Sequence, residues 1–214
     1  DDEVETLLYD GLKDMIPAGV TREQFLSTYR VSSETVGPTI AADIKSRAVM
    51  AVILATIIMF VYIFIRFKNW QYGLGAVAST IHDTLVVIGI YSLLWGIMPF
   101  SMEIDQSFIA AILTVIGYSI NDTVVVFDRL REFLPLHRKR PVKEVLNLAL
   151  NDTLSRTLNT GIASILVLII MFFFGGTTIR GFLFAMIIGI IVGTYSSIFV
   201  ATAVVYDTTK KKLE

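Results

Sequence analysis

Residues 48–65 read AVMAVILATIIMFVYIFI and contain no charged side chain. A helix needs about 20 mostly apolar residues to cross the roughly 30 Å hydrocarbon core of a bilayer. This stretch therefore predicts a transmembrane helix. The whole chain shares its character, because 54% of the 214 residues are hydrophobic and only 17% are charged. A soluble globular enzyme is excluded on this composition, and an integral membrane protein is expected.

Similar stretches with few or no charges recur four times after the first one. We expect five membrane spans, at residues 48–66, 72–96, 107–128, 156–175 and 181–206. The predicted fold is an all-α helical bundle without strands in its membrane part. Residues 1–47 contain nine acidic and five basic side chains and too few apolar ones to predict a fold on their own. We interpret this segment as the end of a water-exposed domain.

Basic residues are distributed unequally between the loops, and this distribution predicts the orientation. Lys and Arg concentrate in the cytoplasmic loops of membrane proteins. The first turn contains Arg66 and Lys68, residues 128–156 contain seven basic side chains, and the tail 207–214 contains three lysines. Residues 96–107 contain none. We therefore expect a periplasmic N-terminal segment and a cytoplasmic C-terminal tail.

The predicted cytoplasmic loop, residues 129–155, contains a helix of its own in this interpretation. Pro141 suits the first turn of a helix, and the residues after it are apolar at helical spacing. We expect this amphipathic helix to lie along the membrane surface or under the bundle.

Several kinds of chemistry are excluded by the composition. The chain contains no cysteine, so disulfides, thiol catalysis and cysteine metal sites are absent. His82 and His137 are too few and too far apart in the sequence for a typical zinc site. The net charge of −1 gives no indication of nucleic-acid binding. We expect no cofactor, no metal and no covalent catalysis, and the Asp at position 1 suggests a piece of a longer chain.

Small residues at four-residue spacing predict close helix packing in two spans. Helices in lipid associate through small side chains that allow their backbones to approach. The last span contains Ala185, Gly189, Gly193, Ser197 and Ala201 at this spacing. The second span has Gly75 and Ser79 followed by Asp83, which lies near the middle of the span beside His82. The Asp83 carboxyl can serve packing or function, and the sequence leaves both open.

The third span contains the polar cluster Tyr118, Ser119, Asn121 and Asp122. A carboxyl inside a spanning helix is costly and usually marks an ion or proton path. Helical spacing is expected to place Asp122 on the same face as Tyr118 and Ser119. Burial disfavours the charged form of the carboxyl, whereas a nearby cation favours it, so such a group can take up and release a proton.

The fourth span supplies the cation. Helical spacing aligns a polar stripe that begins at the cytoplasmic end of the span: Arg156, Asn159, Thr160, Ala163 and Ser164. Arg156 can pair with a carboxylate through two parallel hydrogen bonds, and protonation of Asp122 would release it. Thr157 and Thr160 are possible supporting groups. The alternative is that Arg156 is only an anchor at the membrane surface.

Residues 117–132, GYSINDTVVVFDRLRE, resemble the signature of SecF, a subunit of the bacterial SecDF accessory of the Sec protein-export machinery. Residues 154–160, LSRTLNT, resemble a second motif of this family, and the Val36-Gly37-Pro38 and His82-Asp83 sequences also fit. Asn159 and Gly161 depart mildly from the small polar residues expected there. The resemblance covers about residues 36–206.

This resemblance implies spans two to six of a six-span half of the RND superfamily, in the bacterial inner membrane. It implies a role in protein export driven by the proton-motive force, with protons as the coupling ion and Asp122 and Arg156 as the relay. The implied partners are SecD, separate or fused in the same chain, the SecYEG translocon, YajC, YidC, exported preproteins and membrane lipids. Two other readings remain: an RND-like proton-coupled exporter of small molecules or lipids, and a passive scaffold for the translocon.

Overall fold

The structure is a computed structural model that describes residues 2–17, 19–28 and 38–213. The chain divides into two compact units, Asp1–Lys45 and Ser46–Glu214. Within the described residues every regular element is a helix. Each unit is described by itself.

The N-terminal unit contains α1 (Asp2–Leu12), a 3₁₀ turn η1 (Lys13–Met15) and α2 (Arg22–Thr28). A capping box begins α2: the Gln24 amide lies 3.4 Å from the Thr21 hydroxyl, and the Thr21 amide lies 3.2 Å from the Gln24 side chain. Phe25 is buried against Tyr9, with ring centroids 5.7 Å apart. The Tyr9 hydroxyl donates to the Val20 carbonyl at 2.7 Å. These contacts join the two short helices.

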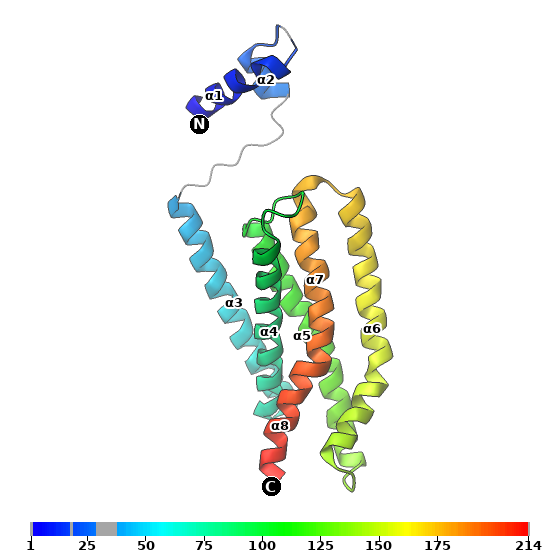
Figure 1. Cartoon of the computed structure of the whole chain (residues 1–214). Helices are drawn as coiled ribbons and strands as arrows, with labels where there is room; N and C mark the ends of the chain where they lie inside the picture. Colours follow the sequence, from blue (N-terminus) through cyan, green and yellow to red (C-terminus); the bar gives the residue numbers. More distant parts are fainter. Residues whose placement is uncertain (1, 18, 29–37, 214) are drawn as a thin grey trace. The chain divides into compact units, whose positions relative to one another are not determined.

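The second unit contains the five helical segments long and apolar enough to cross a membrane, so the predicted fold class is confirmed. Figure 1 shows them as a bundle in which α4 and α7 lie side by side with α5. The helices are α3 (Pro38–Phe67), which belongs to this unit from Ser46 onward, α4 (Trp70–Leu94), α5 (Gln106–Leu136), α6 (Val142–Phe174) and α7 (Arg180–Ser196). α7 continues through a π-helical segment η3 (Ser197–Ala201) into α8 (Thr202–Leu213). A 3₁₀ turn η2 (Thr177–Ile179) joins α6 to α7.

Burial differs strongly between the spans. In the most apolar 18-residue stretch of each helix, half of the residues of α5 are buried inside the bundle, against 11% for α6 and 6% for α3. α3 packs at its C-terminal end, where Ile63 and Phe67 are buried and the Phe67 ring stacks on Tyr72 at 5.0 Å. Figure 1 shows α3 diverging from α4 away from this contact. The bundle is therefore organised around α5.

The predicted loop 129–155 is mostly helical, and its bounds as a segment outside the membrane stay a prediction. Residues 129–136 belong to α5, and the predicted amphipathic helix after Pro141 is the beginning of α6, continuous with the fourth span. Only His137–Pro141 separates the two helices. Charged side chains mark where a helix leaves the hydrocarbon, but they do not end it, so α5 continues past Arg129 and through Pro135 to Leu136. Pro141 is the N-cap of α6.

The predicted tail 207–214 is helical as far as Leu213, where α8 ends, and its place in the cytoplasm stays a prediction. Lysines at the C-terminal end of a helix interact favourably with its dipole, so the basic residues are compatible with helix. Sequence reasoning also missed η3, a π-helical segment inside the last span. π-helical turns are rare and occur often at functional sites.

Glycines allow the closest helix contacts in the bundle. A Cβ atom at Gly189 would lie 2.1 Å from Val115 on α5, and one at Gly193 would lie 3.0 Å from Ser119. A Cβ atom at Gly75 on α4 would lie 2.7 Å from the Ala201 carbonyl oxygen in η3. These positions fix the distances between α4, α5 and the last span, and they thereby position the polar residues described next.

Candidate functional site

Two carboxyl groups are buried inside the spanning helices. Asp83 on α4 is completely buried, and Asp122 on α5 is 3% exposed. A charged carboxylate at the centre of a bilayer costs about 2.5–3.5 kcal/mol on insertion scales. Such a cost is tolerated where the carboxyl has partners or serves a function. The two groups differ in their surroundings.

Asp83 is hydrogen-bonded across the interface between α4 and α5. The Ser119 hydroxyl donates to one Asp83 oxygen at 2.6 Å. His82 Nδ1 lies 3.1 Å from the other oxygen. The His82 ring lies beside the Tyr195 ring on α7, with centroids 6.2 Å apart. The carboxyl therefore has a partner for each of its oxygens.

Asp122 has no comparable partners. Its buried Oδ2 atom makes no hydrogen bond within the part of the chain that the structure describes. Three hydroxyls on neighbouring turns are equally buried and unpaired: Tyr118 on α5, Thr157 on α6 and Thr194 on α7. A Cβ atom at Gly161 would lie 3.1 Å from the Thr194 hydroxyl and 4.0 Å from that of Tyr118. The junction of α5, α6 and α7 is thus polar, buried and unsatisfied.

The predicted ion pair between Asp122 and Arg156 is not formed in this arrangement. Arg156 is exposed on α6, and no ion pair within 4.0 Å joins it to Asp122 among the described residues. It remains within electrostatic range of the Asp122 carboxyl. The stripe that it begins is also exposed at Asn159 and Thr160. The spacing of residues on α6 aligned this stripe correctly, but it did not determine how far α6 is rotated toward α5.

The other predicted residues occupy varied surroundings. The shared helix face predicted that Ser119 and Asp122 point in the same direction. Ser119 instead points to Asp83 on α4. Asn121 is exposed, and the Thr160 hydroxyl donates to the carbonyl of its own helix at Arg156, at 2.9 Å. Ser79 and Ser197 are buried and likewise donate within their helices.

Ion pairs lie at the end of the bundle where α3 meets α4 and α5 meets α6. Arg66 on α3 pairs with Asp128 on α5 at 3.1 Å. Arg129 pairs with Glu132 at 2.7 Å and with Asp152 on α6. All five side chains are partly exposed, so these pairs lie at the surface of the bundle and contribute little each. Arg66–Asp128 and Arg129–Asp152 connect two helices, whereas Arg129–Glu132 lies within α5.

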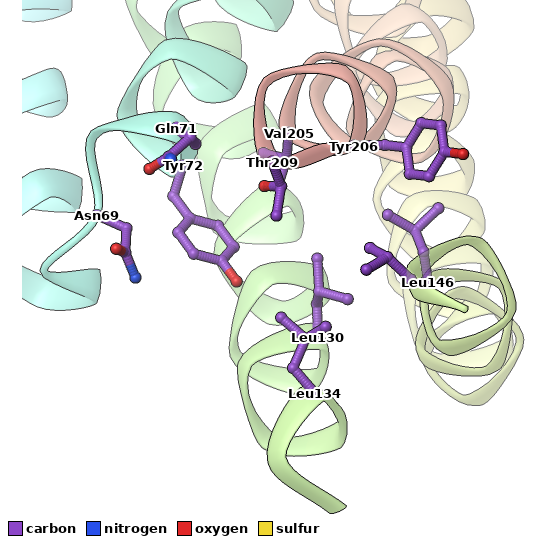
Figure 2. Close-up of a pocket in the computed structure, with 10 residues that line it drawn as sticks. Asn69, Gln71, Tyr72, Leu130, Leu134, Leu146, Val205, Tyr206 and Thr209 are labelled. Atoms are coloured by element: carbon purple, nitrogen blue, oxygen red, sulfur yellow. The ribbon is translucent and has the colours of Figure 1, made fainter. Parts of the chain in front are cut away.

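A cavity of about 110 Å³ lies at the same end, between α4, α5, α6 and α8. Figure 2 shows Tyr72 and Leu130 on one side of it and Tyr206 on another. The Gln71 side chain lines the cavity, and its buried Oε1 atom has no partner among the described residues. The Tyr72 ring, which lines the cavity, also contacts the Phe127 ring edge to face, with ring centroids 5.0 Å apart. The cavity is mostly apolar, with a few polar groups at its wall.

Sequence reasoning missed Thr194 and Gln71. Thr194 follows Gly193 in an apolar stretch, and only its place beside the Gly161 backbone makes it part of the polar junction. Gln71 follows Trp70 at the beginning of α4, where a polar residue is ordinary. No group of three or more His, Cys, Asp or Glu side chains that could hold a metal ion occurs in the part of the chain searched.

Comparisons with known proteins agree in pointing to one family. The family model described as "Protein export membrane protein SecD/SecF, C-terminal" matches residues 18–211. Protein translocase subunit SecF of Rhodothermus marinus is 52% identical over 177 residues, which are 83% of this chain and 57% of the relative. Protein translocase subunit SecDF of Thermus thermophilus is 42% identical over 82% of this chain and 23% of its own length.

A solved structure resembles the computed one in fold. The crystal structure of SecDF in its super-membrane-facing form matches with a TM-score of 0.72 and 36% sequence identity, over 89% of this chain and 26% of that chain. The chain spans little more than half the length of the SecF relatives that it matches, from 50% to 62% of each. The similarity therefore covers nearly all of this chain but only part of the relatives.

Proposed function

Because the chain belongs to the SecD/SecF C-terminal family of protein export membrane proteins, we propose that it is the membrane bundle of an accessory subunit of the Sec translocase. In this function it couples proton movement down the proton-motive force to the export of preproteins across the bacterial inner membrane. The names of its relatives, protein translocase subunits SecF and SecDF, support the export role. The proton coupling rests on the geometry of the polar junction.

The observation that carries the proposal is the buried Asp122 carboxyl with an unpaired oxygen. An unpaired polar atom in a spanning segment costs free energy, so a protein retains it where it has a use. A carboxyl in such a place is stabilised by binding a proton or by gaining a cation. Arg156, on the neighbouring helix, can supply that cation after a modest rotation of α6.

The mechanism follows from these two alternatives. When Asp122 is ionised, it attracts the Arg156 guanidinium toward the junction of α5, α6 and α7. When Asp122 takes up a proton, the attraction is lost and Arg156 moves away. Of the three spans that meet at this junction, α6 is the least buried in the bundle, at 11% of its most apolar stretch against 50% for α5 and 44% for the last span, so it is the one suited to such movement. The Tyr118, Thr157 and Thr194 hydroxyls can donate to the ionised carboxyl or to a water between them.

The energy available limits what one proton can do. One elementary charge moved across a potential of 100 mV releases about 2.3 kcal/mol. Driving a two-state equilibrium from 1:99 to 99:1 requires about 5.5 kcal/mol. A single proton at Asp122 therefore biases the bundle but does not carry it through a complete transition.

The exposed polar stripe on α6 supports a partner in the membrane. An arginine facing hydrocarbon costs about 2.5–3.5 kcal/mol on insertion scales, which favours a second protein or water over lipid at Arg156. SecD is the partner that fits, because relatives join the two as SecDF in one chain. The SecYEG translocon, YajC, YidC and exported preproteins belong to the proposal as further partners. The N-terminal unit would lie in the periplasm and the tail in the cytoplasm.

Proton flux tests this function. The full complex with SecD is reconstituted into vesicles, and flux under an imposed potential is compared between wild type and Asp122→Asn. We expect flux to fall to the background of empty vesicles in the variant. The control is Asp128→Asn, a carboxyl at a surface ion pair, which should retain wild-type flux. Wild-type flux in an assembled Asp122→Asn complex would contradict the relay and favour a passive scaffold.

The alternative of an RND-like exporter gives a different result in the same vesicles. A small molecule or lipid carried by the protein would stimulate proton flux when added, and preprotein export would not respond to Asp122. We propose no covalent chemistry, in keeping with the relatives' names as translocase subunits.

A further inference from the structure

Asp83 is the second carboxyl inside the bundle, and the relay at Asp122 does not use it. It lies near the middle of α4 and is completely buried. Ser119 donates to one of its oxygens at 2.6 Å, and His82 Nδ1 lies 3.1 Å from the other. A seam between helices is ordinarily closed by small residues, as Gly75 and Gly193 close it here. Packing alone therefore does not explain why a carboxyl is buried at this position.

No lysine or arginine forms an ion pair with Asp83 among the described residues. Within the described residues the Lys and Arg ion pairs lie elsewhere, at the helix ends and in the N-terminal unit. The titratable side chains on the stretches packed around it are His82 on α4, Tyr195 on α7 and Tyr118 and Asp122 on α5. Only His82 can offset its charge. A carboxylate beside a neutral imidazole carries one negative charge. The pair becomes neutral when it binds one further proton, on either partner.

Ser119 connects this pair to the helix that holds Asp122. A serine hydroxyl has one proton to donate, and here it goes to Asp83 across the α4–α5 interface. Gly193 on α7 lies behind Ser119, where a Cβ atom would come within 3.0 Å of it, so the side chain has little room to turn. A carboxyl that gains a proton becomes a donor itself, and Ser119 is then no longer held in the same way. The proton on Asp83 therefore changes the contact between α4 and α5.

We propose that the His82–Asp83 pair is a second proton-binding site of this bundle, and that Ser119 transmits its state to α5. The proposal rests on the proposed function and deepens it. α5 would respond to protons on two sides: to a proton on Asp83 through Ser119, and to a proton on Asp122, which lies three residues after Ser119 on the same helix. Two protons moved across the same potential release twice the free energy that one proton at Asp122 releases.

Infrared difference spectroscopy tests the site without any export measurement. Spectra of the full complex are recorded in acidic and in alkaline buffer, and the protonated-carboxyl stretching bands are compared between wild type and variants. We expect Asp83→Asn to remove one band and Asp122→Asn to remove a different one. Ser119→Ala should shift the Asp83 band to higher frequency, because the carboxyl loses a hydrogen bond, and should leave the Asp122 band in place. Bands that persist in both Asp variants belong to other carboxyls of the complex.

The matched control is Ser79→Ala. Ser79 is buried on the same side of α4 one turn away, but its hydroxyl donates to the Ala76 carbonyl, so both bands should remain unchanged. An assembled Asp83→Asn complex with a wild-type difference spectrum would overturn the proposal. If Asp83→Asn does not assemble, Ser119→Ala decides, and an unshifted spectrum in that variant overturns it as well. Either result leaves the Asp122 band, and hence the proposed relay, to be judged separately.

Discussion

The two sides of α5 offer a comparison within a single helix. Toward α4, Ser119 closes a hydrogen bond to Asp83, and glycines hold the helices together. Toward α6, Asp122 Oδ2 and the hydroxyls of Tyr118, Thr157 and Thr194 have no hydrogen-bond partner among the described residues. At the level of Ser119 the first side is satisfied, because both Asp83 oxygens have a partner. On the second side, a rotation of α6, a water molecule or another protein could supply hydrogen-bond partners for these polar groups.

This difference indicates which helix of the bundle is expected to shift against the others. A satisfied polar contact between well-packed helices resists displacement, because breaking it leaves a buried group unpaired. A junction with unpaired polar groups lowers its free energy when a rearrangement gives those groups partners. α6 borders that junction and is buried over only 11% of its most apolar stretch, against half for α5. We therefore expect α4, α5 and the last span to behave as a unit and α6 to shift against them.

The largest effect is expected from Arg156→Met, which removes the cation on the mobile side. Proton flux in reconstituted complex should fall to background, because protonation of Asp122 no longer changes the position of any charge on α6. Arg156→Lys should restore part of the flux, since it keeps the charge but loses the bidentate geometry. Full flux in Arg156→Met vesicles would show that the arginine is only an anchor.

The packed side is tested by Gly189→Ala. The added methyl group would lie 2.1 Å from Val115, and overpacking of this kind costs about 1–3 kcal/mol. We expect the variant to lose stability in a detergent unfolding assay. Gly117→Ala on α5 is the control, because a Cβ atom there meets nothing within 4 Å. Equal stability of the two variants would mean that α5 and α7 are not rigidly packed.

The same comparison explains how much the sequence could predict. The spans follow from the length of apolar stretches, because the bilayer imposes that length on any helix that crosses it. Asp122 and Arg156 stand out because charged side chains are rare in such stretches. Neither argument contains information on the rotation of one helix against another. The predicted Asp122–Arg156 ion pair is therefore not formed between these described residues, and their role as a relay stays a prediction.

Ser119 illustrates the same limit at shorter range. Residues three apart on a helix differ in direction by about 60°, and they appear to share a face when the helix is considered alone. When two helices pack on either side, that angle is enough to direct Ser119 toward α4 while Asp122 lies one turn away at the junction with α6 and α7. The π-helical segment η3 was beyond sequence reasoning because it depends on how the last span fits against α4.

The smallest effects come from hydroxyl substitutions on the two sides of α5, and they sharpen the comparison most. Ser119→Ala removes an interhelical hydrogen bond, which in membranes is worth about 0.6 kcal/mol on average and at most about 1.7 kcal/mol. Thr157→Val removes a buried hydroxyl without a partner among the described residues, so it should leave the free energy of unfolding unchanged or slightly raised. Both free energies come from equilibrium unfolding of the assembled complex in detergent.

The sign of the difference between these two variants carries the argument. If Thr157→Val destabilises as much as Ser119→Ala, then Thr157 is hydrogen-bonded in the assembled complex and the α6 side is as complete as the α4 side. In that case α6 would be held in place, and the rotation proposed for Arg156 would have to break a formed contact. If only Ser119→Ala destabilises, the asymmetry of α5 is a property of the protein in its membrane, and α6 is free to respond to the charge on Asp122.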